Sequence, residues 1–467
     1  MRTEKFKTLF DFAPKSNIKA GDGLDVGNFP FYTSSSILSK RIDKALYNDE
    51  ALIFGTGGSA SVHCALEPFS TSTDCIVAIT KSEEFNAKFV YYYLFGNKYI
   101  LERGFKGAGL KHISKKYIEN IDIPVLPFET QNKIVAVLDK ANTLVSKREQ
   151  SIQFLDELLR ATFLDMFGDP AVNTKKLKLI PFHLVIEKID AGWSPKCEEN
   201  QRSNNDEWAV LKQSAVSRRF FNPIENKLLP TGINIKKEIT AQKGDLLLSR
   251  KNSKEYVGSA AYVFEEYEKL LLPDTIFNLR YNPEKVSGLY LFYLINDNNY
   301  QKVIQNLRTG AAGSMPNISQ QKLMEHSIPL PEISEQKKFE DIVFNTYSKK
   351  KKVLVSKVEV ENLFNSILQK VFNGQLNFNV DFELDALIHE IDLQKKENDL
   401  SKIVGDIAFL QRLVDKLNSQ EFKEKELYDK AKHGVFQLLK AGDKVEQIVK
   451  KIKINYKIES SLILSLK

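Results

Sequence analysis

The sequence predicts an α+β protein: two mixed α/β domains separated by a long antiparallel two-helix coiled coil, with a mostly helical C-terminal appendage. Three features lead to this prediction. An internal repeat recurs at an offset of 205 residues, a long apolar seam follows each copy, and short apolar runs bounded by turn residues precede each seam. With 467 residues, 42% of them hydrophobic, the chain is long enough for about three separate cores.

The repeat appears as an ordered series of matches. Ile113-Ser114 matches Ile318-Ser319, Ile123-Pro124 matches Ile328-Pro329, and Gln131 matches Gln336. At the smaller offset of 200, Asp74-Cys75-Ile76 lies over Asp274-Thr275-Ile276. A coincidental similarity between two α+β pieces is the alternative, but an ordered series at two nearby offsets favours duplication.

Residues 1–127 and 174–331 have the pattern of mixed α/β domains. Apolar runs such as 51–54 and 246–248 are bounded by Gly, Ser, Asn and Asp, which is typical of strands joined by turns. A more helical stretch follows in each copy.

Residues 128–168 and 332–374 each predict one long helix. Alternating steps of four and three residues from Ile134 select ten positions, of which eight are apolar, and the same steps from Phe339 select seven apolar residues out of ten. A 3.5-residue period over five heptads indicates that the two helices, each about 58 Å long, pack on one another. Antiparallel packing would put the mixed domains at opposite ends of the pair, whereas parallel packing would need a long chain return.

The seam includes Val145 and Ile152 in the first helix and is interrupted by the charged residues Arg148, Lys350 and Lys357. Polar residues within a seam can fix the register of two helices. Ordinary solvated positions at the edge of the seam explain these charges equally well, so both interpretations stay open.

Residues 380–467 lie outside the repeat. Apolar residues at helical spacing between Leu384 and Val414, and again between Tyr428 and Leu439, predict a mostly helical appendage, and the end of the chain is compatible with a small hairpin. No chemistry can be assigned to this appendage.

The sequence lacks the motifs of common catalytic classes. It has no GxxxxGK[ST] loop, no HExxH, no Cys/His spacing for zinc and no CxxC pair among its three cysteines. The glycine loop from Phe54 to Ser59 resembles that of adenine-N6 DNA methyltransferases, but their Asn/Asp-Pro-Pro-aromatic motif is absent and a tight turn is the simpler explanation. We therefore expect a chain that is not an enzyme and holds neither metal nor cofactor.

Binding is the function that remains. The net charge is +7, from 67 Lys and Arg against 60 Asp and Glu, and cations gather in glycine- and serine-containing loops of both repeats. Such loops suit contacts to phosphates and base edges, so double-stranded DNA is the expected partner, with solvated basic faces as the alternative. The candidate DNA-contacting residues are Ser59, Lys106, Lys111, His112, Lys115 and Lys116 in the first repeat, and Lys212, Arg218, Arg219, Arg250, Lys251, Asn252, Lys254 and Arg308 in the second.

We expect a cytoplasmic location and no membrane contact. No run of eighteen apolar residues occurs, and the N-terminus has no apolar core of signal-peptide length. Three cysteines without a pairing pattern suit a reducing compartment.

The duplicated motifs and the long helices that follow them resemble the specificity subunit of type I restriction-modification systems. The resemblance is carried by the segments from Gly109 to Gln131 and from Gly313 to Gln336. The second segment is the closer match, because the first has Thr130 where the family has an acid.

The resemblance covers residues 1 to about 376 and implies two target recognition domains, each reading half of a split DNA sequence. It implies that an antiparallel helix pair sets the gap between the half-sites. It also implies that DNA methyltransferase subunits dock on this frame and that motor-nuclease restriction subunits join them. S-adenosylmethionine, ATP and magnesium would belong to those partners. The appendage after residue 380 has no counterpart in the basic family pattern.

Two other functions must be distinguished from this one. A coiled-coil adaptor that does not bind DNA would show no salt-dependent retention of DNA on nitrocellulose. A methyltransferase with a degenerate motif would bind S-adenosylmethionine as a purified single chain, which the specificity-subunit interpretation denies.

Overall fold

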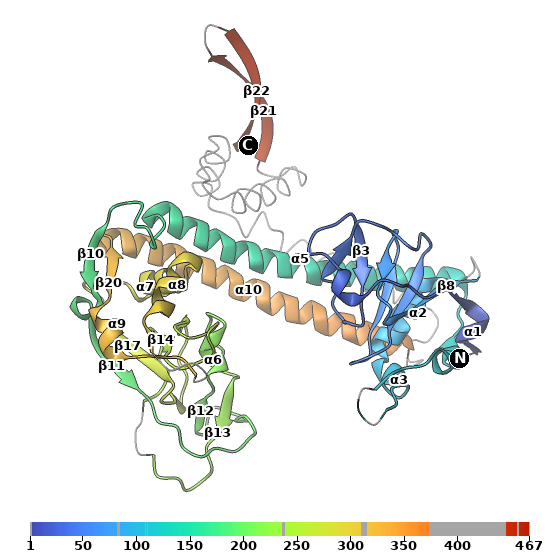
Figure 1. Ribbon diagram of the computed structural model, residues 1–467, viewed down its shortest axis with the longest axis horizontal. Helices are drawn as coiled ribbons and strands as arrows, with labels where there is room; N and C mark the ends of the chain where they lie inside the picture. Colours follow the sequence, from blue (N-terminus) through green and yellow to red (C-terminus); the bar gives the residue numbers. More distant parts are fainter. Residues whose placement is uncertain are drawn as a thin grey trace.

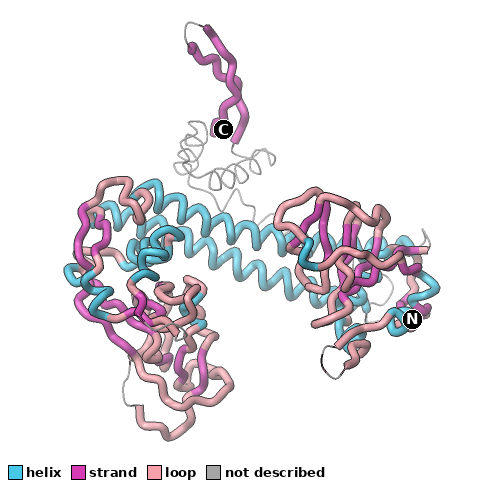
Figure 2. The backbone as a smooth tube through the Cα atoms, in the orientation of Figure 1, coloured by secondary structure: helices cyan, strands magenta, loops and turns pink. Residues whose placement is uncertain are grey.

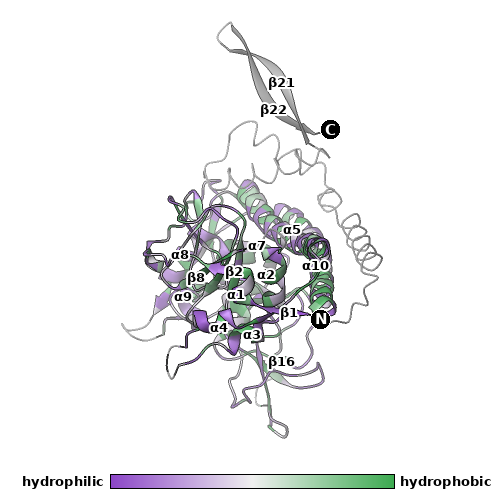
Figure 3. Cartoon of the chain, turned by 90° about the vertical axis from the view of Figure 1, so that its right-hand side faces the viewer, coloured by the Kyte–Doolittle hydropathy of each residue, from purple (hydrophilic) through white to green (hydrophobic). Residues whose placement is uncertain are grey.

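The computed structural model describes residues 2–81, 85–107, 109, 111–235, 239–309 and 315–372, and the strands 445–454 and 457–466. Within these residues, two globular domains lie at opposite ends of a pair of long helices (Figure 1). The helices are α5 (Phe128–Phe167) and α10 (Ile333–Phe372), each 40 residues and therefore about 60 Å long. Seen end-on, α5 and α10 lie together toward one edge, and both domains extend to the other side (Figure 3).

In the described residues, the N-terminal domain contains a four-stranded, a three-stranded and a two-stranded sheet together with four short α-helices. Its strands are β1 (Thr3–Lys5), β2 (Phe10–Phe12), β3 (Phe29–Tyr32), β4 (Lys40–Ile42), β5 (Ala51–Gly55), β6 (Val62–Ala65), β7 (Ser70–Thr71), β8 (Cys75–Thr80) and β9 (Asp122–Pro124). Its helices are α1 (Phe6–Leu9), α2 (Ala87–Gly96), α3 (Lys98–Glu102) and α4 (Lys115–Glu119). The strand orders are β2-β8-β5-β6 and β4-β3-β7, and β9 pairs with β1 immediately before α5 begins.

The C-terminal domain repeats this plan. Its strands are β10 (Lys178–Pro181), β11 (Ile186–Ala191), β12 (Ala209–Leu211), β13 (Asn226–Leu228), β14 (Leu246–Ser249), β15 (Ala260–Tyr262), β16 (Leu270–Leu271), β17 (Ile276–Tyr281), β18 (Arg308–Thr309), β19 (Asn317–Ile318) and β20 (Ser327–Leu330). Its helices are α6 (Ser214–Ser217), α7 (Gly288–Asn296), α8 (Asn298–Asn306) and α9 (Gln320–Glu325). The orders β11-β17-β14-β15 and β13-β12-β16 reproduce those of the first domain, which confirms the duplication, and Figure 2 shows the mixed α/β character of both copies.

The central strand of each large sheet is buried on both faces. In β5, Leu52 and Phe54 join the core that α2 and α5 cover, while Ile53 joins the core beneath the smaller sheet. Successive side chains of a strand point to opposite faces, so an uninterrupted apolar run can serve two cores at once. In β14, Leu246 joins the core that α7 and the long helices cover, and Leu247 joins the core beneath the smaller sheet.

Polar contacts between α5 and α10 show that the two helices are antiparallel. Glu149 forms an ion pair with Lys357 at 2.9 Å, and Asp156, later in α5, forms one with Lys350, earlier in α10, at 2.6 Å. Next to the first of these pairs, the buried Arg148 donates from Nε to Ser356 Oγ at 2.9 Å. The charged interruptions of the seam therefore bind across the pair and fix its register.

The predicted seam positions need two corrections. Val145 and Ile152 are only half-buried, whereas the neighbouring Leu144 and Ser151 are buried. Lys357 likewise lies beside the seam, and Ser356 is the buried residue. A strict 3.5-residue ladder drifts around a helix of 3.6 residues per turn, so the positions it selects near the middle shift by one residue.

Each long helix begins at one domain and ends against the other. At its C-terminal end, α5 packs Phe163 and Phe167 against Tyr290 of α7 and Phe339 of α10. The C-terminal end of α10 packs Phe372 against Phe89 of α2. Each domain therefore holds both helices, which ties the two ends of the molecule together.

The C-terminal hairpin predicted from the sequence is confirmed: β21 (Val445–Ile454) pairs with β22 (Lys457–Leu466) in an antiparallel register. The helical segments predicted between Leu384 and Leu439 lie outside the described residues. Among the described helices, none combines the length and the apolar character needed to cross a bilayer.

We expect Lys357→Glu to destabilise the protein, because it places a third carboxylate beside Glu149 and Glu361, which lie 2.9 and 3.3 Å from the Lys357 ammonium. Loss of the cross-helix pair and the new repulsion should together lower the free energy of unfolding by about 1–2 kcal/mol at low salt, and less at high salt. Urea denaturation at two salt concentrations measures this effect. Lys352→Glu, an exposed position of the same helix, is the control, and equal effects of the two changes would contradict the assigned register.

Candidate nucleic-acid interface

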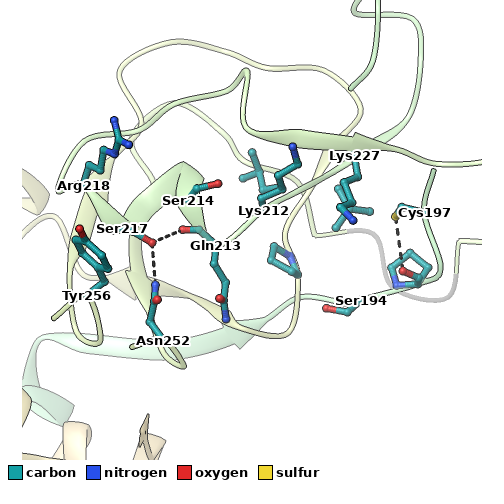
Figure 4. A pocket seen from close by; sticks show the side chains of 14 residues that line it. Ser194, Cys197, Lys212, Gln213, Ser214, Ser217, Arg218, Lys227, Asn252 and Tyr256 are labelled. Atoms are coloured by element: carbon teal, nitrogen blue, oxygen red, sulfur yellow. Dashed lines mark hydrogen bonds between the residues drawn. The ribbon is translucent and has the colours of Figure 1, made fainter. Parts of the chain in front are cut away.

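The C-terminal domain has a cavity of about 660 Å³ with many polar lining residues (Figure 4). Its lining includes residues of β12 and α6, which lie on the side of the domain away from the long helices (Figure 1). Its lining comprises Ser194, Pro195, Cys197, Val210, Leu211, Lys212, Gln213, Ser214, Ser217, Arg218, Lys227, Asn252, Tyr256 and Pro273. Three of these side chains are cationic and none is a carboxylate, so the cavity suits an anionic or hydrogen-bonding ligand.

The ends of strands from both sheets build this cavity. Lys212 follows β12 directly and leads into α6, while Asn252 follows β14. Gln213 Nε2 donates to the main-chain oxygen of Lys251 at 2.6 Å, which joins the two strand ends. In Figure 4, Arg218 and Tyr256 mark one end of the cavity and Lys227 marks the other.

The three cations of the cavity differ in their partners. Lys227 forms an ion pair with Glu199 at 2.9 Å. Within the described part of the chain, Lys212 and Arg218 have no carboxylate within ion-pair distance. Both therefore remain available to an external anion such as a phosphate.

Asn252 lines the cavity, but its side-chain amide is hydrogen-bonded to other residues of the domain. Its Nδ2 donates to Ser217 Oγ at 2.8 Å and to Ser249 Oγ at 3.0 Å, and its Oδ1 accepts from the main-chain N–H of Ser253 at 2.8 Å. The side chain is 8% exposed. Asn252 therefore supports the wall of the cavity.

Two arginines predicted to contact DNA also form hydrogen bonds within the domain. Arg219 donates to the main-chain oxygen of Asn296 at 3.1 Å and to Asn298 Oδ1 at 2.9 Å, and burial lowers the pKa of its guanidinium. Arg250 donates from Nε to Asn317 Oδ1 at 3.0 Å and lies 5.1 Å from the centre of the Phe277 ring. These two guanidinium groups fasten loops to the core.

The remaining predicted residues of this domain are exposed. Lys251 and Lys254 lie in the loop between β14 and β15, and the Lys251 backbone bridges to Asn317 in β19. Arg308 lies in β18, which pairs with β19. The fold therefore brings the Lys251 loop and the β18–β19 hairpin together.

In the N-terminal domain, the structure joins two loops that are about 50 residues apart in sequence. The His112 backbone bridges to Gly57 and to Lys106, and the main-chain N–H of Ile113 donates to the oxygen of Thr56 at 3.1 Å. Gly58 has a φ of 79°, in the left-handed region that favours glycine. The glycine loop is therefore a tight turn that supports the basic loop.

The predicted residues of the N-terminal domain are all exposed: Ser59, Lys106, Lys111, His112, Lys115 and Lys116. Ser59 is in the glycine turn beside His112, and Lys115 and Lys116 are in α4, which follows the basic loop. Lys115 Nζ lies 5.2 Å from the centre of the Phe12 ring, so its position is partly set by an aromatic contact.

Sequence reasoning missed several cavity residues. Gln213 and Ser214 are neutral and follow β12, and Tyr256 is in the loop that carries Lys254. These residues are next to cations predicted to contact DNA, and this position could have identified them, since polar side chains in loops at strand ends often line binding sites. Ser194 gave no such signal, because only the folded chain brings its hydroxyl against Asp274.

A second, smaller cavity of about 440 Å³ lies near β11 and β17. Arg280 in its wall contacts Asp245 at 2.6 Å and Asp190 at 3.1 Å. Burial raises the pKa of Asp245, while hydrogen bonds and charges from Lys188 and Arg280 outweigh burial and lower the pKa of Asp190. These charges neutralise one another, so this cavity has little charge left for a ligand.

Comparison with known proteins identifies related chains. A family model described as "Type I restriction modification DNA specificity domain" matches residues 3–153 and 170–356. The Escherichia coli protein named type I restriction enzyme EcoEI specificity subunit is 25% identical over 419 residues, covering 69% of each chain. A Methanocaldococcus jannaschii protein, type I restriction enzyme MjaVIII specificity subunit, is 22% identical, covering 62% of this chain and 70% of its own.

A solved structure has a similar fold. It is the S subunit of a type I restriction-modification system from M. genitalium, with a TM-score of 0.53 and 14% sequence identity. The alignment covers 79% of this chain and 96% of that one.

The three unpaired cysteines should differ in reactivity. Burial raises the pKa of the Cys64 thiol to about 12 and that of Cys75 to about 11, which leaves little thiolate at neutral pH, whereas Cys197 is at the edge of the cavity with a smaller rise in pKa. We expect maleimide to modify Cys197 at least about tenfold faster than the other two in the native protein. Mass spectrometry of peptides gives the rates, and urea-unfolded protein, where all three should react alike, is the control. Faster modification of Cys75 would contradict the described packing.

Proposed function

Because the chain belongs to the family of type I restriction-modification DNA specificity subunits, we propose that it reads a bipartite DNA target and positions methyltransferase and restriction subunits on it. The arrangement of two copies of one domain at opposite ends of an antiparallel helix pair supports this proposal most strongly. Two separate reading domains held at a fixed distance suit a target made of two half-sites.

In this proposal, residues 1–127 and 174–331 are the two target recognition domains. The ranges expected for the coiled coil that would separate them, 128–168 and 332–374, contain α5 and α10. Half-sites on one face of a duplex lie about 34–36 Å apart per helical turn. A helix pair about 60 Å long can span that distance once the width of each domain is included.

Each recognition domain would use two kinds of residue. Lys212 and Arg218 in one domain, and Lys106, Lys111 and Lys115 in the other, carry exposed or half-buried cations that suit phosphates. Gln213 and Ser214 in the 660 Å³ cavity each use a donor within the domain, on the Lys251 oxygen and on Glu225 Oε2, and their side-chain oxygens can still accept hydrogen bonds from base edges. The two domains differ in these loops, so they would read different half-sites.

Chemistry would reside on the partners. The sequence lacks the catalytic motif of an adenine methyltransferase and a phosphate-binding loop. S-adenosylmethionine would therefore be bound by methyltransferase subunits, and ATP with magnesium by motor-nuclease subunits. The complex would act in the cytoplasm, where its DNA substrate is found.

The double change Lys212→Ala and Arg218→Ala should weaken DNA binding roughly tenfold at moderate salt, because it removes two phosphate contacts. The slope of log affinity against log salt should fall by about two. Nitrocellulose retention of a random-sequence duplex across a salt series measures both quantities. Lys178→Ala, an exposed lysine of β10 far from the cavity, should change neither.

A wild-type chain whose DNA retention does not depend on salt would support the coiled-coil adaptor instead. A wild-type slope that the double change leaves intact would remove the cavity from the DNA interface. The two results are distinguishable because the first concerns the whole chain and the second only one domain.

Deletion of residues 149–155 together with residues 349–355 should shorten the recognised gap between half-sites. These segments face each other across the helix pair, and each heptad contributes about 10 Å of helix length. Asp156 would then take the position of Glu149 opposite Lys357, and Arg148 would keep Ser356 as its partner, so the cross-helix contacts are retained. Sequencing of duplexes selected from a random library gives the gap. The same gap in the deleted and intact chains would show that helix length does not set it.

A further inference from the structure

Gln131 and Gln336 occupy equivalent positions of the repeat, each in the first turn of a long helix. Both are buried, with 1% and 0% of the side chain exposed. A buried side-chain amide is costly unless both its donor and its acceptor are hydrogen-bonded, so its partners reveal what it does.

Both glutamines make the same two hydrogen bonds. Gln131 Oε1 accepts from the main-chain N–H of Asn86 at 3.0 Å, and its Nε2 donates to the oxygen of Leu126 at 2.8 Å. Gln336 Oε1 accepts from the N–H of Ser287 at 2.8 Å, and its Nε2 donates to the oxygen of Pro331 at 2.8 Å. Each amide therefore joins its long helix to two separate segments of its own globular domain.

The first of these segments is the start of the domain helix that packs on the long helices. Asn86 is the N-cap of α2, where its Oδ1 accepts from Lys88 N and Phe89 N, and Ser287 caps α7 through Oγ in the same way. The second segment is the short connection between the last strand of the domain, β9 or β20, and the long helix. The two glutamines thus hold α2 and α7 at a fixed angle to α5 and α10.

Each domain makes a second, more exposed contact with its long helix. It lies about two turns beyond Gln131 in α5 and about one turn beyond Gln336 in α10. Tyr92 OH and Lys88 Nζ donate to Asp139 in α5 at 2.5 and 2.7 Å. Ser287 Oγ donates to Glu340 in α10 at 2.5 Å. Two ties at different heights resist rotation of the domain about the joint, which a single contact would permit.

We propose that Gln131 and Gln336 are positioning residues that fix the angle of each recognition domain on the helix pair and thereby set the gap between half-sites. The proposal rests on the function proposed above. A rotation of about 10° at the joint moves a surface about 20 Å away by roughly 3.5 Å, which is the rise of one base pair. Helix length alone therefore cannot define the gap unless the joints are rigid.

Gln131→Leu and Gln336→Leu test this role, because leucine keeps the bulk of the side chain and leaves two main-chain groups without their partner. Each full-length variant selects duplexes from a random-sequence library, and sequencing gives both half-sites and the gap. The wild type should select two motifs at one gap. The variants should select the same motifs, with the fraction at the wild-type gap falling at least threefold and neighbouring gaps appearing.

Gln301→Leu is the matched control. Gln301 is 2% exposed and is in α8 of the C-terminal domain, but among the described residues its amide has no hydrogen-bond partner. Because this amide does not connect the domain to a long helix, its loss should leave the gap between half-sites unchanged. Gln131→Met and Gln336→Met keep an unbranched side chain of similar length and remove both the amide donor and the amide acceptor. They serve if a leucine variant fails to fold, and they too should broaden the gap.

Three outcomes would overturn the proposal. Folded variants that keep the single wild-type gap would show that the amides do not position the domains. Variants that lose the motifs themselves would show that the amides only stabilise each domain. A wild-type chain that selects no paired motifs would refute the proposed function as well, and this third result is distinct from the other two.

Discussion

The buried contact between α5 and α10 runs along both helices, and the main core of each globular domain is completed by it. Each globular domain packs on the beginning of one helix and the end of the other, so neither domain has a complete core without the pair. The aromatic residues Phe163, Phe167 and Phe372 make these end contacts, and Arg148 with Ser356 marks the centre. The seam is thus both a spacer and a shared part of two cores, which explains how one chain can hold two separate domains in a fixed relation.

The polar residues of the seam determine the register of the two helices, whereas its apolar residues contribute most of the stability of the pair. Leucine and valine contacts change little when two helices slide by one heptad, but only one alignment forms both the Glu149–Lys357 and the Asp156–Lys350 pair, because a slide by one heptad leaves a single acid–lysine pair. Arg148 adds a buried hydrogen bond to the same alignment. Its equivalent in the repeat is Val353, so the charge is present on only one of the two helices. A pair of identical helices would bring two such charges to the centre.

The basic residues of the candidate interface are of two kinds: some have no carboxylate partner among the described residues, and others are hydrogen-bonded within the domain. Lys212 and Arg218 face the cavity without a carboxylate partner in the described residues, while Arg219 and Arg250 fasten loops through their guanidinium groups. Composition and spacing treat these four residues alike, because each lies in a basic, polar segment. Only the direction of each side chain in the folded domain distinguishes them. Asn252 is a further example, since its amide is consumed by two serine hydroxyls.

The sequence by itself determined the duplication, the strand-rich character of both domains and the presence of two long helices, because these depend on local periodicity and on repeated motifs. It also indicated the glycine turn and the final hairpin. Only the tertiary structure decided the one-residue shift at the centre of the seam, the internal use of Arg219, Arg250 and Asn252, and the joining of Asn86 and Leu126 by Gln131. These features arise where segments far apart in the chain meet, and the geometry of such meetings depends on the packing of the whole domain and not on any local pattern.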